Sequence, residues 1–350
     1  MSRFFSKRHS DLVSYTPGEQ PQIANLIKLN TNESPFPPSE KVAKALNEAS
    51  RKLNLYSDPT ASSLHEKFAE IKGVKPTQVL ATNGSDEILN FAFIAFCDES
   101  SSAVFPDITY GFYPVFAKLN GVPYEEIPLK DDFTINPEDY IGINKNIFIA
   151  NPNAPTGIFM ELDDIEKIVK SNPSNIVVID EAYVDFGAKS AVSLVDKYDN
   201  LLVTQTFSKS RSFAGARLGF GIGCEALIND LNTIKYSTNP YNVNSMTMAA
   251  GIAVLEDENT TISNCKVIEQ VREFTISELN KLGFICTDSK ANFVFAKHTK
   301  YSGEFIYKKL RENSILVRHF DKERIKDYNR ITIGTFEQMK KMISILEKIL

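Results

Sequence analysis

Short apolar runs recur along the first two thirds of the chain, separated by stretches of helical length. The short runs predict buried strands, at residues 79–82, 103–105, 147–150, 176–180, 201–206 and 218–222. The intervening stretches at 86–97, 161–170 and 225–235 have the length and pattern of helices. This alternation predicts an α/β fold, in which a large domain has a mostly parallel sheet flanked by helices. Ligands of such sheets bind at the carboxyl ends of the strands.

The pattern changes in the last third of the chain. Residues 244–282 read as a long, largely helical passage. After it we expect strands at 291–296, 315–318 and 330–334 and helices at 303–312 and 336–350. Residues 1–40 are rich in Pro, Asn and Ser and predict an arm rather than a domain. We therefore expect a large domain at 41–260 and a small α+β domain at 261–350, completed by the arm.

Composition narrows the function classes. The 350 residues carry a formal net charge of −5, which argues against sequence-independent binding of nucleic acid. No apolar run approaches the ~18 residues of a membrane span, and the basic opening lacks the apolar segment of a secretory signal. We therefore expect a cytoplasmic protein without nucleic-acid or membrane partners. The four cysteines and four histidines lack the spacing of a metal site or a disulfide framework, so no metal is expected.

The main candidate for chemistry is a lysine among hydroxyl and small residues. Lys209 lies in the run Thr-Phe-Ser-Lys-Ser-Arg-Ser-Phe-Ala-Gly-Ala-Arg at 206–217. Hydroxyl, ammonium and guanidinium groups in one short segment suit a phosphate-bearing ligand held beside a reactive amine. A second run, Val-Val-Ile-Asp-Glu-Ala-Tyr at 177–183, ends a predicted strand at Asp180 and is followed by Tyr183. Together the two runs indicate an enzyme built around one lysine.

These residue types could hold pyridoxal phosphate, an aldehyde cofactor that a lysine amine binds as a Schiff base. Asp180 could keep the pyridine nitrogen protonated, Tyr183 could hydrogen-bond the ring oxygen, and Tyr110 could stack on the ring. The phosphate would need a strand-to-helix turn, whose N–H groups and positive helix end attract anions, and further polar groups. The candidates for this phosphate site are Gly84, Ser85, Asp86, Thr206, Ser208 and Arg217.

Two nucleotide-binding patterns are incomplete. The apolar run before Asp180 and Glu181 also describes a Walker B strand, but the chain has no G-x-x-x-x-G-K-[ST] loop. Residues 221–226 fit G-x-G-x-x-[GA], but no acidic residue follows about 20 residues later, where a ribose partner belongs. Neither a nucleotide hydrolase nor a dinucleotide-binding protein is therefore favoured.

Eleven short motifs occur in the order in which one enzyme family carries them. They are Y-x-P-G-E (15–19), K-L-N-T-N-E-S-P (28–35), L-Y-S-D-P (55–59), N-G-S-D-E (83–87), N-P-N-A-P-T-G (151–157), D-E-A-Y (180–183), T-F-S-K (206–209), A-G-A-R-L-G (214–219), A-N-F-V (291–294), V-R-H-F (317–320) and R-I-T-I-G (330–334). Through them the sequence resembles, nearly end to end, the fold-type I aminotransferases of pyridoxal phosphate, and among these the histidinol-phosphate aminotransferases. Each motif alone is weak, whereas the ordered set is specific.

The resemblance implies a substrate class and an assembly. Arg330 and Arg318 would bind the carboxylate of 2-oxoglutarate or glutamate and the phosphate of histidinol phosphate, because a planar guanidinium pairs with either oxyanion. Tyr15 and Asn32 would also contact the substrate. Tyr56 would reach the cofactor phosphate of a neighbouring subunit, so a homodimer with shared sites is implied.

One position departs from the family pattern. The family has N-P-x-N-P-T-G, in which the asparagine before P-T-G bonds the ring oxygen, and this chain has Ala154 there. Asn153 or Asn151 could substitute by a local shift, or Tyr183 could make the bond alone.

Lys209, Asp180 and Tyr183 are the expected catalytic residues of an amino transfer between L-histidinol phosphate and 2-oxoglutarate. The same scaffold would also suit an aromatic amino-acid aminotransferase or a threonine-phosphate decarboxylase. A catalytically silent regulatory protein that binds the cofactor is an alternative of another class. The intact lysine, aspartate and tyrosine argue against it.

Overall fold

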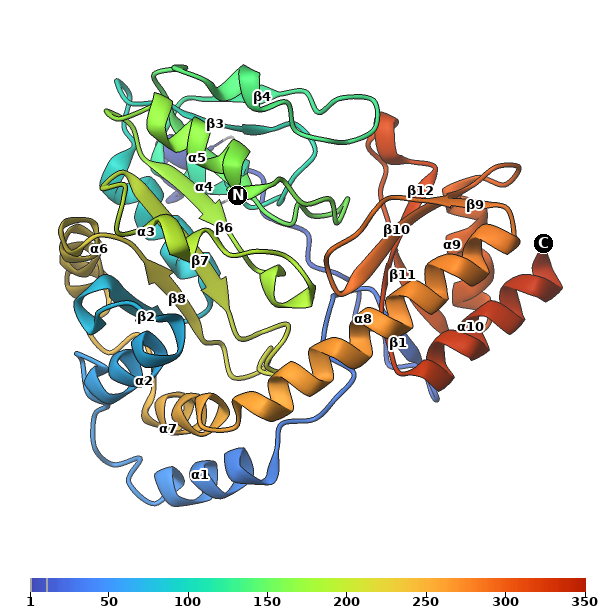
Figure 1. Cartoon of the computed structure of the whole chain (residues 1–350), viewed down its shortest axis with the longest axis horizontal. Helices are drawn as coiled ribbons and strands as arrows, with labels where there is room; N and C mark the ends of the chain where they lie inside the picture. Colours follow the sequence, from blue (N-terminus) through green and yellow to red (C-terminus); the bar gives the residue numbers. More distant parts are fainter. Residues whose placement is uncertain (1, 11) are drawn as a thin grey trace.

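Two β-sheets organise the computed structural model, which describes residues 2–10 and 12–350 (Figure 1). The larger sheet has seven strands in the spatial order β2 (Val79–Thr82), β8 (Gly219–Ile222), β7 (Leu201–Thr206), β6 (Val177–Asp180), β5 (Asn146–Ala150), β3 (Ala103–Pro106) and β4 (Tyr124–Ile127). Strands β3 to β7 pair in parallel, and β8 is antiparallel to both of its neighbours. The predicted α/β fold with a mostly parallel sheet is confirmed.

Helices cover both faces of this sheet. Alternate strand residues point to opposite faces, so Ile147 and Ile149 enter one apolar core whereas Phe148 and Ala150 enter the other. The first core is closed by α1 (Glu40–Ser50), α2 (Ser62–Lys72), α5 (Leu162–Ser171) and α7 (Ser245–Leu255). The second is closed by α3 (Ser85–Phe96), α4 (Tyr113–Asn120) and α6 (Glu225–Thr238). Burial on both faces explains why the central strands read as continuous apolar runs.

The smaller sheet has the order β1 (Ile27–Leu29), β11 (Ile315–His319), β12 (Tyr328–Thr332), β10 (Phe293–His298) and β9 (Phe284–Cys286). Its core includes side chains of α8 (Glu258–Lys281), α9 (Gly303–Glu312) and α10 (Phe336–Ile349). β1 pairs in parallel with β11, so the N-terminal arm completes this sheet as expected. The long helix α8 leads from α7 to the smaller sheet (Figure 1), and residue 260 lies within it. The division of the chain into domains at residues 40 and 260 stays a prediction.

Several elements differ from the sequence-based expectation. The passage 244–282 is two helices, because Glu256 and Asp257 separate α7 from α8. Strands β4 and β9 were not predicted, since the Tyr-Glu-Glu-Ile sequence of β4 belongs to a half-exposed edge strand and β9 has three residues. Short 3₁₀ turns lie at Lys7–His9, Pro76–Gln78, Pro137–Tyr140, Val184–Phe186, Ala191–Leu194 and Glu323–Ile325.

Within residues 2–10 and 12–350, no helix combines the length and apolarity needed to cross a membrane. The same described residues contain no group of three or more His, Cys, Asp or Glu side chains arranged to hold a metal ion.

Candidate active site

Two cavities adjoin one another where β5, β6 and β7 end. The smaller has a volume of about 150 Å³ and the larger about 460 Å³. Their walls share Thr31, Tyr110, Ala154, Tyr183 and Lys209. Ala154, Tyr183 and Lys209 come from the loops after β5, β6 and β7, respectively. The predicted lysine therefore lies between the two cavities. A residue that contacts both a cofactor and a substrate needs such a position.

Lys209 reaches this position on the loop that follows β7. Its Nζ donates to the backbone carbonyl of Thr31 over 3.4 Å and lies 5.9 Å from the centroid of the Tyr183 ring. Among the residues that the structure describes, no carboxylate forms an ion pair with this ammonium. The amine is thus left without a fixed counter-ion beside both cavities.

Asp180 forms the buried polar end of the smaller cavity. It is the last residue of β6, and its carboxylate accepts hydrogen bonds from Thr204 Oγ1 at 3.1 Å and Tyr113 Oη at 3.2 Å. Burial raises the pKa of Asp180 to about 6, against the opposing effect of these hydrogen bonds. A buried carboxylate that is costly to ionise gains from a cationic partner, and a protonated pyridine nitrogen is such a partner.

A second polar wall of the smaller cavity is built around the start of α3. Gly84 caps this helix at φ +82°, and the first N–H groups of a helix lack partners within it. Arg217, also in the left-handed region at φ +56°, donates to Ser208 Oγ at 3.3 Å and to Asp86 Oδ2 at 3.2 Å. Ser85, Asp86, Thr206, Ser208 and Arg217 all line the cavity. The hydroxyl groups, the helix N–H groups and the Arg217 guanidinium suit an anion, whereas the Asp86 carboxylate accepts from Arg217 and holds it in place. Five of the residues predicted for a phosphate thus line one cavity.

The two predicted ring partners are tyrosines with different attachments. The Tyr110 hydroxyl donates to Asp86 Oδ1 over 2.6 Å, and burial raises its pKa well above the usual value. The Tyr183 hydroxyl accepts from Asn32 Nδ2 over 2.8 Å. The Asn32 amide nitrogen therefore donates to Tyr183, and Asn32 is also among the residues that line the larger cavity.

Asn153 does not reach either cavity. Its Nδ2 donates to the Ile108 carbonyl and to Thr156 Oγ1, and its Oδ1 accepts from Thr109 Oγ1. Asn151 exchanges both amide groups with the Met160 backbone. The proposed substitution of either amide for the residue missing at Ala154 is not supported by this geometry.

Tyr56 also lies outside both cavities of its own chain. Its side chain is 84% exposed and stacks on Tyr241, with ring centroids 4.5 Å apart. A role at a cofactor would require a second subunit, as the resemblance implied.

The larger cavity contains two arginines directly opposite one another. Arg318 of β11 and Arg330 of β12 are register partners, and no carboxylate of the described residues forms an ion pair with either. Like charges opposite one another in a sheet are unfavourable. Arg330 Nη2 donates to the Asn30 carbonyl at 2.9 Å, while its buried Nε has no hydrogen-bond partner among residues 2–10 and 12–350. Burial lowers the pKa of this guanidinium. The pair is arranged for an anion that comes from outside the chain.

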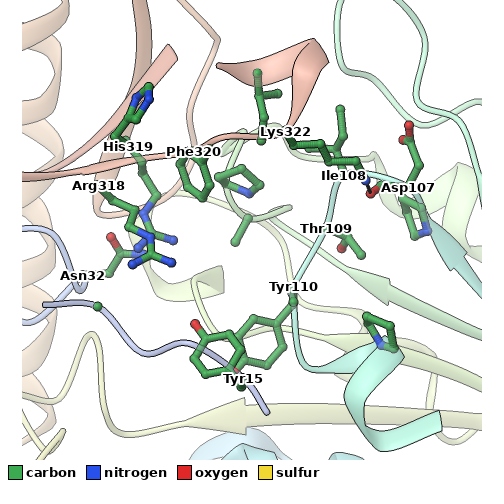
Figure 2. A pocket seen from close by; sticks show the side chains of 18 of the residues that line it. Tyr15, Asn32, Asp107, Ile108, Thr109, Tyr110, Arg318, His319, Phe320 and Lys322 are labelled. Carbon is green, nitrogen blue, oxygen red and sulfur yellow. Dashed lines mark hydrogen bonds between the residues drawn. The ribbon is translucent and has the colours of Figure 1, made fainter. Parts of the chain in front are cut away.

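Figure 2 shows how the larger cavity is lined. Arg318 projects from β11 into the space above Tyr15 and Tyr110, whereas His319 turns away from it. Tyr15 stacks on Phe112, with ring centroids 4.1 Å apart. The arm thus contributes an aromatic ring on the side of the cavity opposite the arginine.

A family model describing class I and II aminotransferases matches residues 24–346. The chain belongs to the class I and II aminotransferases. Its relatives include histidinol-phosphate aminotransferase 2 of Dechloromonas aromatica (strain RCB), which is 48% identical over 100% of this chain and 99% of the relative. The histidinol-phosphate aminotransferase of Brachyspira hyodysenteriae is 49% identical over 97% of this chain and 96% of its own length.

The solved structures agree on the fold of this aminotransferase. The histidinol-phosphate aminotransferase of Sinorhizobium meliloti, solved in complex with pyridoxal-5'-phosphate, superposes with a TM-score of 0.84 at 20% identity. The match covers 93% of this chain and 92% of that one. At this identity the likeness shows a shared fold-type I architecture.

Three polar groups of this aminotransferase site were missed from the sequence. Thr204 could have been found, because it is the register partner of Asp180 in the adjacent parallel strand. Tyr113 depends on how α4 packs on the sheet, and the Thr31 carbonyl is a backbone group of the arm. Neither of these two has a sequence signal.

Proposed function

We propose that this aminotransferase transfers the amino group of L-histidinol phosphate to 2-oxoglutarate, giving imidazole-acetol phosphate and L-glutamate in histidine biosynthesis. The observation that carries the substrate assignment is the opposed pair Arg318 and Arg330, which has no carboxylate partner among the described residues. Two adjacent guanidinium groups suit a phosphate dianion in one half-reaction and a carboxylate in the other. The names of the relatives that match this chain from end to end point to the same substrate.

The smaller cavity fits the family cofactor, pyridoxal phosphate. Asp180 would hold the ring nitrogen, Tyr183 the ring oxygen, and the start of α3 with Ser208 and Arg217 the phosphate. When bound, this cofactor supplies an aldehyde for amines and a ring that accepts electron density. A fit test within the chain is Gly84, where an added Cβ would overlap Arg217. A larger residue here would have to displace the Arg217 guanidinium, and the φ of +82° also favours glycine.

Other residues of the chain have separate roles in proton transfer, in electrostatic stabilisation and in substrate positioning. Lys209 Nζ lies between the two cavities. Once free, it would take the proton from the substrate α-carbon as a base and, as an acid, would deliver it to the aldehyde carbon of the bound cofactor. Asp180 keeps a proton at the ring nitrogen through its negative charge. Arg318 and Arg330 hold the distal oxyanion, which fixes the α-carbon within reach of the lysine.

We further propose a homodimer in which Tyr56 of one subunit completes the phosphate site of the other. Its exposed ring, absent from both cavities of its own chain, supports this assembly. The substrates are small molecules, and a cytoplasmic location is proposed because the reaction belongs to amino-acid biosynthesis.

A panel of amino donors tests the substrate assignment. L-histidinol phosphate, L-histidinol and L-phenylalanine are compared in kcat/KM for the first half-reaction. We expect histidinol phosphate to exceed histidinol by about 100-fold or more, because hydrogen bonds to charged groups contribute about 1.5–3 kcal/mol each. Arg318→Gln should remove most of this difference. Arg311→Gln, which alters an exposed arginine already paired with Glu19, is the control and should preserve it.

The same panel separates the rival functions. A preference for phenylalanine by orders of magnitude would rule out the histidinol-phosphate assignment. A protein that binds the cofactor but reacts with no amine would be the silent regulatory version. Release of carbon dioxide from threonine phosphate would indicate the decarboxylase.

A further inference from the structure

Asn32 has hydrogen-bond partners for its backbone and for both ends of its side-chain amide. It is buried, lies just after β1 and has a left-handed backbone at φ +56°, a conformation that asparagine tolerates better than most residues. Its backbone N–H donates to Thr332 Oγ1 at 3.0 Å, and its carbonyl accepts from Asn292 Nδ2 at 3.0 Å. Both ends of the residue are thus tied to the smaller sheet.

The same contacts determine which way the Asn32 amide points. Thr332 Oγ1 accepts from the Asn32 N–H, so its own hydrogen is available for Asn32 Oδ1, 3.0 Å away. With Oδ1 facing Thr332, the amide nitrogen must face Tyr183, whose Oη lies 2.8 Å from it. An amide nitrogen can only donate, so the tyrosine oxygen is the acceptor.

The hydrogen of the Tyr183 hydroxyl must then point elsewhere. No acceptor among the described residues lies within hydrogen-bond distance of Oη, and Tyr183 lines both cavities. Its ring packs edge-on against Phe293, with centroids 5.1 Å apart, which fixes its plane. Ala154 lies in the same apolar cluster. Its side chain has no polar atom that could donate a hydrogen bond into the cavity.

We propose that Asn32 is a positioning residue that fixes Tyr183 as a hydrogen-bond donor into the cofactor cavity. This inference rests on the proposed cofactor and gives the expected substrate ligand Asn32 a different task. The donated N–H also polarises the tyrosine O–H, which strengthens it as a donor to an anionic ring oxygen. Asn32 and Tyr183 together supply the bond that Ala154 cannot.

The test is a spectroscopic titration of the holoenzyme without substrate. The visible band of the Lys209-bound cofactor changes when the proton shared by the lysine nitrogen and the ring oxygen is lost. A weaker donor from Tyr183 leaves more negative charge on the ring oxygen, so this proton is held to higher pH. Asn32→Gly removes the amide and keeps the left-handed backbone with its two backbone hydrogen bonds. We expect the midpoint to rise by about one pH unit, the scale of one hydrogen bond.

A double-mutant cycle with Tyr183→Phe distinguishes positioning from general damage. Tyr183→Phe alone should raise the midpoint at least as much, and Asn32→Gly should add no further shift in that background. The control is Asn172→Gly, which removes a buried amide that donates to the Tyr140 carbonyl and lines neither cavity, and it should leave the midpoint unchanged. Thr332→Val, which removes the hydroxyl that orients the amide, should shift it in the same direction and serves if Asn32→Gly does not fold.

The outcomes separate this inference from the function on which it rests. A parent protein without a visible cofactor band would refute the cofactor proposal itself. A normal band whose midpoint does not move in Asn32→Gly, or that moves equally with and without the Tyr183 hydroxyl, would refute the positioning role and leave the proposed function intact.

Discussion

At the scale of single residues, the site buries the Asp180 carboxylate in a place where its negative charge lowers the free energy of unfolding. The pKa of Asp180 is raised by burial to about 6, so the folded state holds this proton more tightly than the unfolded chain. Its ionisation therefore destabilises the apo protein above pH 6, and this cost fades as the pH falls toward 4. We predict that Asp180→Asn stabilises the apo protein by roughly 3 kcal/mol at pH 8, with a smaller difference near pH 4, and weakens cofactor binding about 10- to 100-fold. Denaturant unfolding at both pH values and cofactor titration measure this. A variant less stable than the parent at pH 8 would contradict the assigned cost.

At the scale of elements, the phosphate wall depends on close contact between β8 and the start of α3. A Cβ added at Gly219 would overlap the Ser85 nitrogen and the Gly84 carbonyl carbon, which are backbone atoms that cannot rotate away. We predict that Gly219→Ala displaces this helix start and raises the cofactor dissociation constant about 10-fold or more, the effect of losing about 1.4 kcal/mol. Gly215→Ala is the matched control, because a Cβ there meets nothing within 4 Å. Equal cofactor affinity of the two variants would show that the contact is unimportant for binding.

The helices and strands also show which parts of the fold and of the site can be predicted from the sequence alone. Buried central strands such as β6 were predictable, because burial on both faces produces unbroken apolar runs. The edge strand β4 was not, since its Glu125 and Glu126 are exposed and resemble a loop. Within the site, Lys209 and Asp180 end or follow such strands. The side-chain hydrogen bonds of Asn153 and Asn32 are made to residues distant in sequence, such as Ile108 and Tyr183. Only the folded structure reveals these hydrogen bonds.

At the scale of the whole molecule, the proposed dimer makes each site depend on its neighbour. Tyr56 is exposed and stacked on Tyr241, and Leu53 and Leu55 beside it are also exposed. We predict a solution mass of twice the 39.2 kDa chain, measured by light scattering. Tyr56→Ala should keep this mass and raise the cofactor dissociation constant about 10-fold, as expected for one hydrogen bond to a charged group. Unchanged cofactor affinity in an intact dimer would exclude Tyr56 from the phosphate site.

The most direct measurement of the central claim is borohydride reduction of the holoenzyme, followed by proteolysis and mass mapping of the peptides. Reduction makes the bond between the cofactor and its lysine permanent. The position of Lys209 between the two cavities predicts one pyridoxyl adduct, on the peptide that contains Lys209, and its loss in Lys209→Ala. An adduct on another lysine of the parent protein, or no adduct in a protein that shows the visible band, would contradict the account.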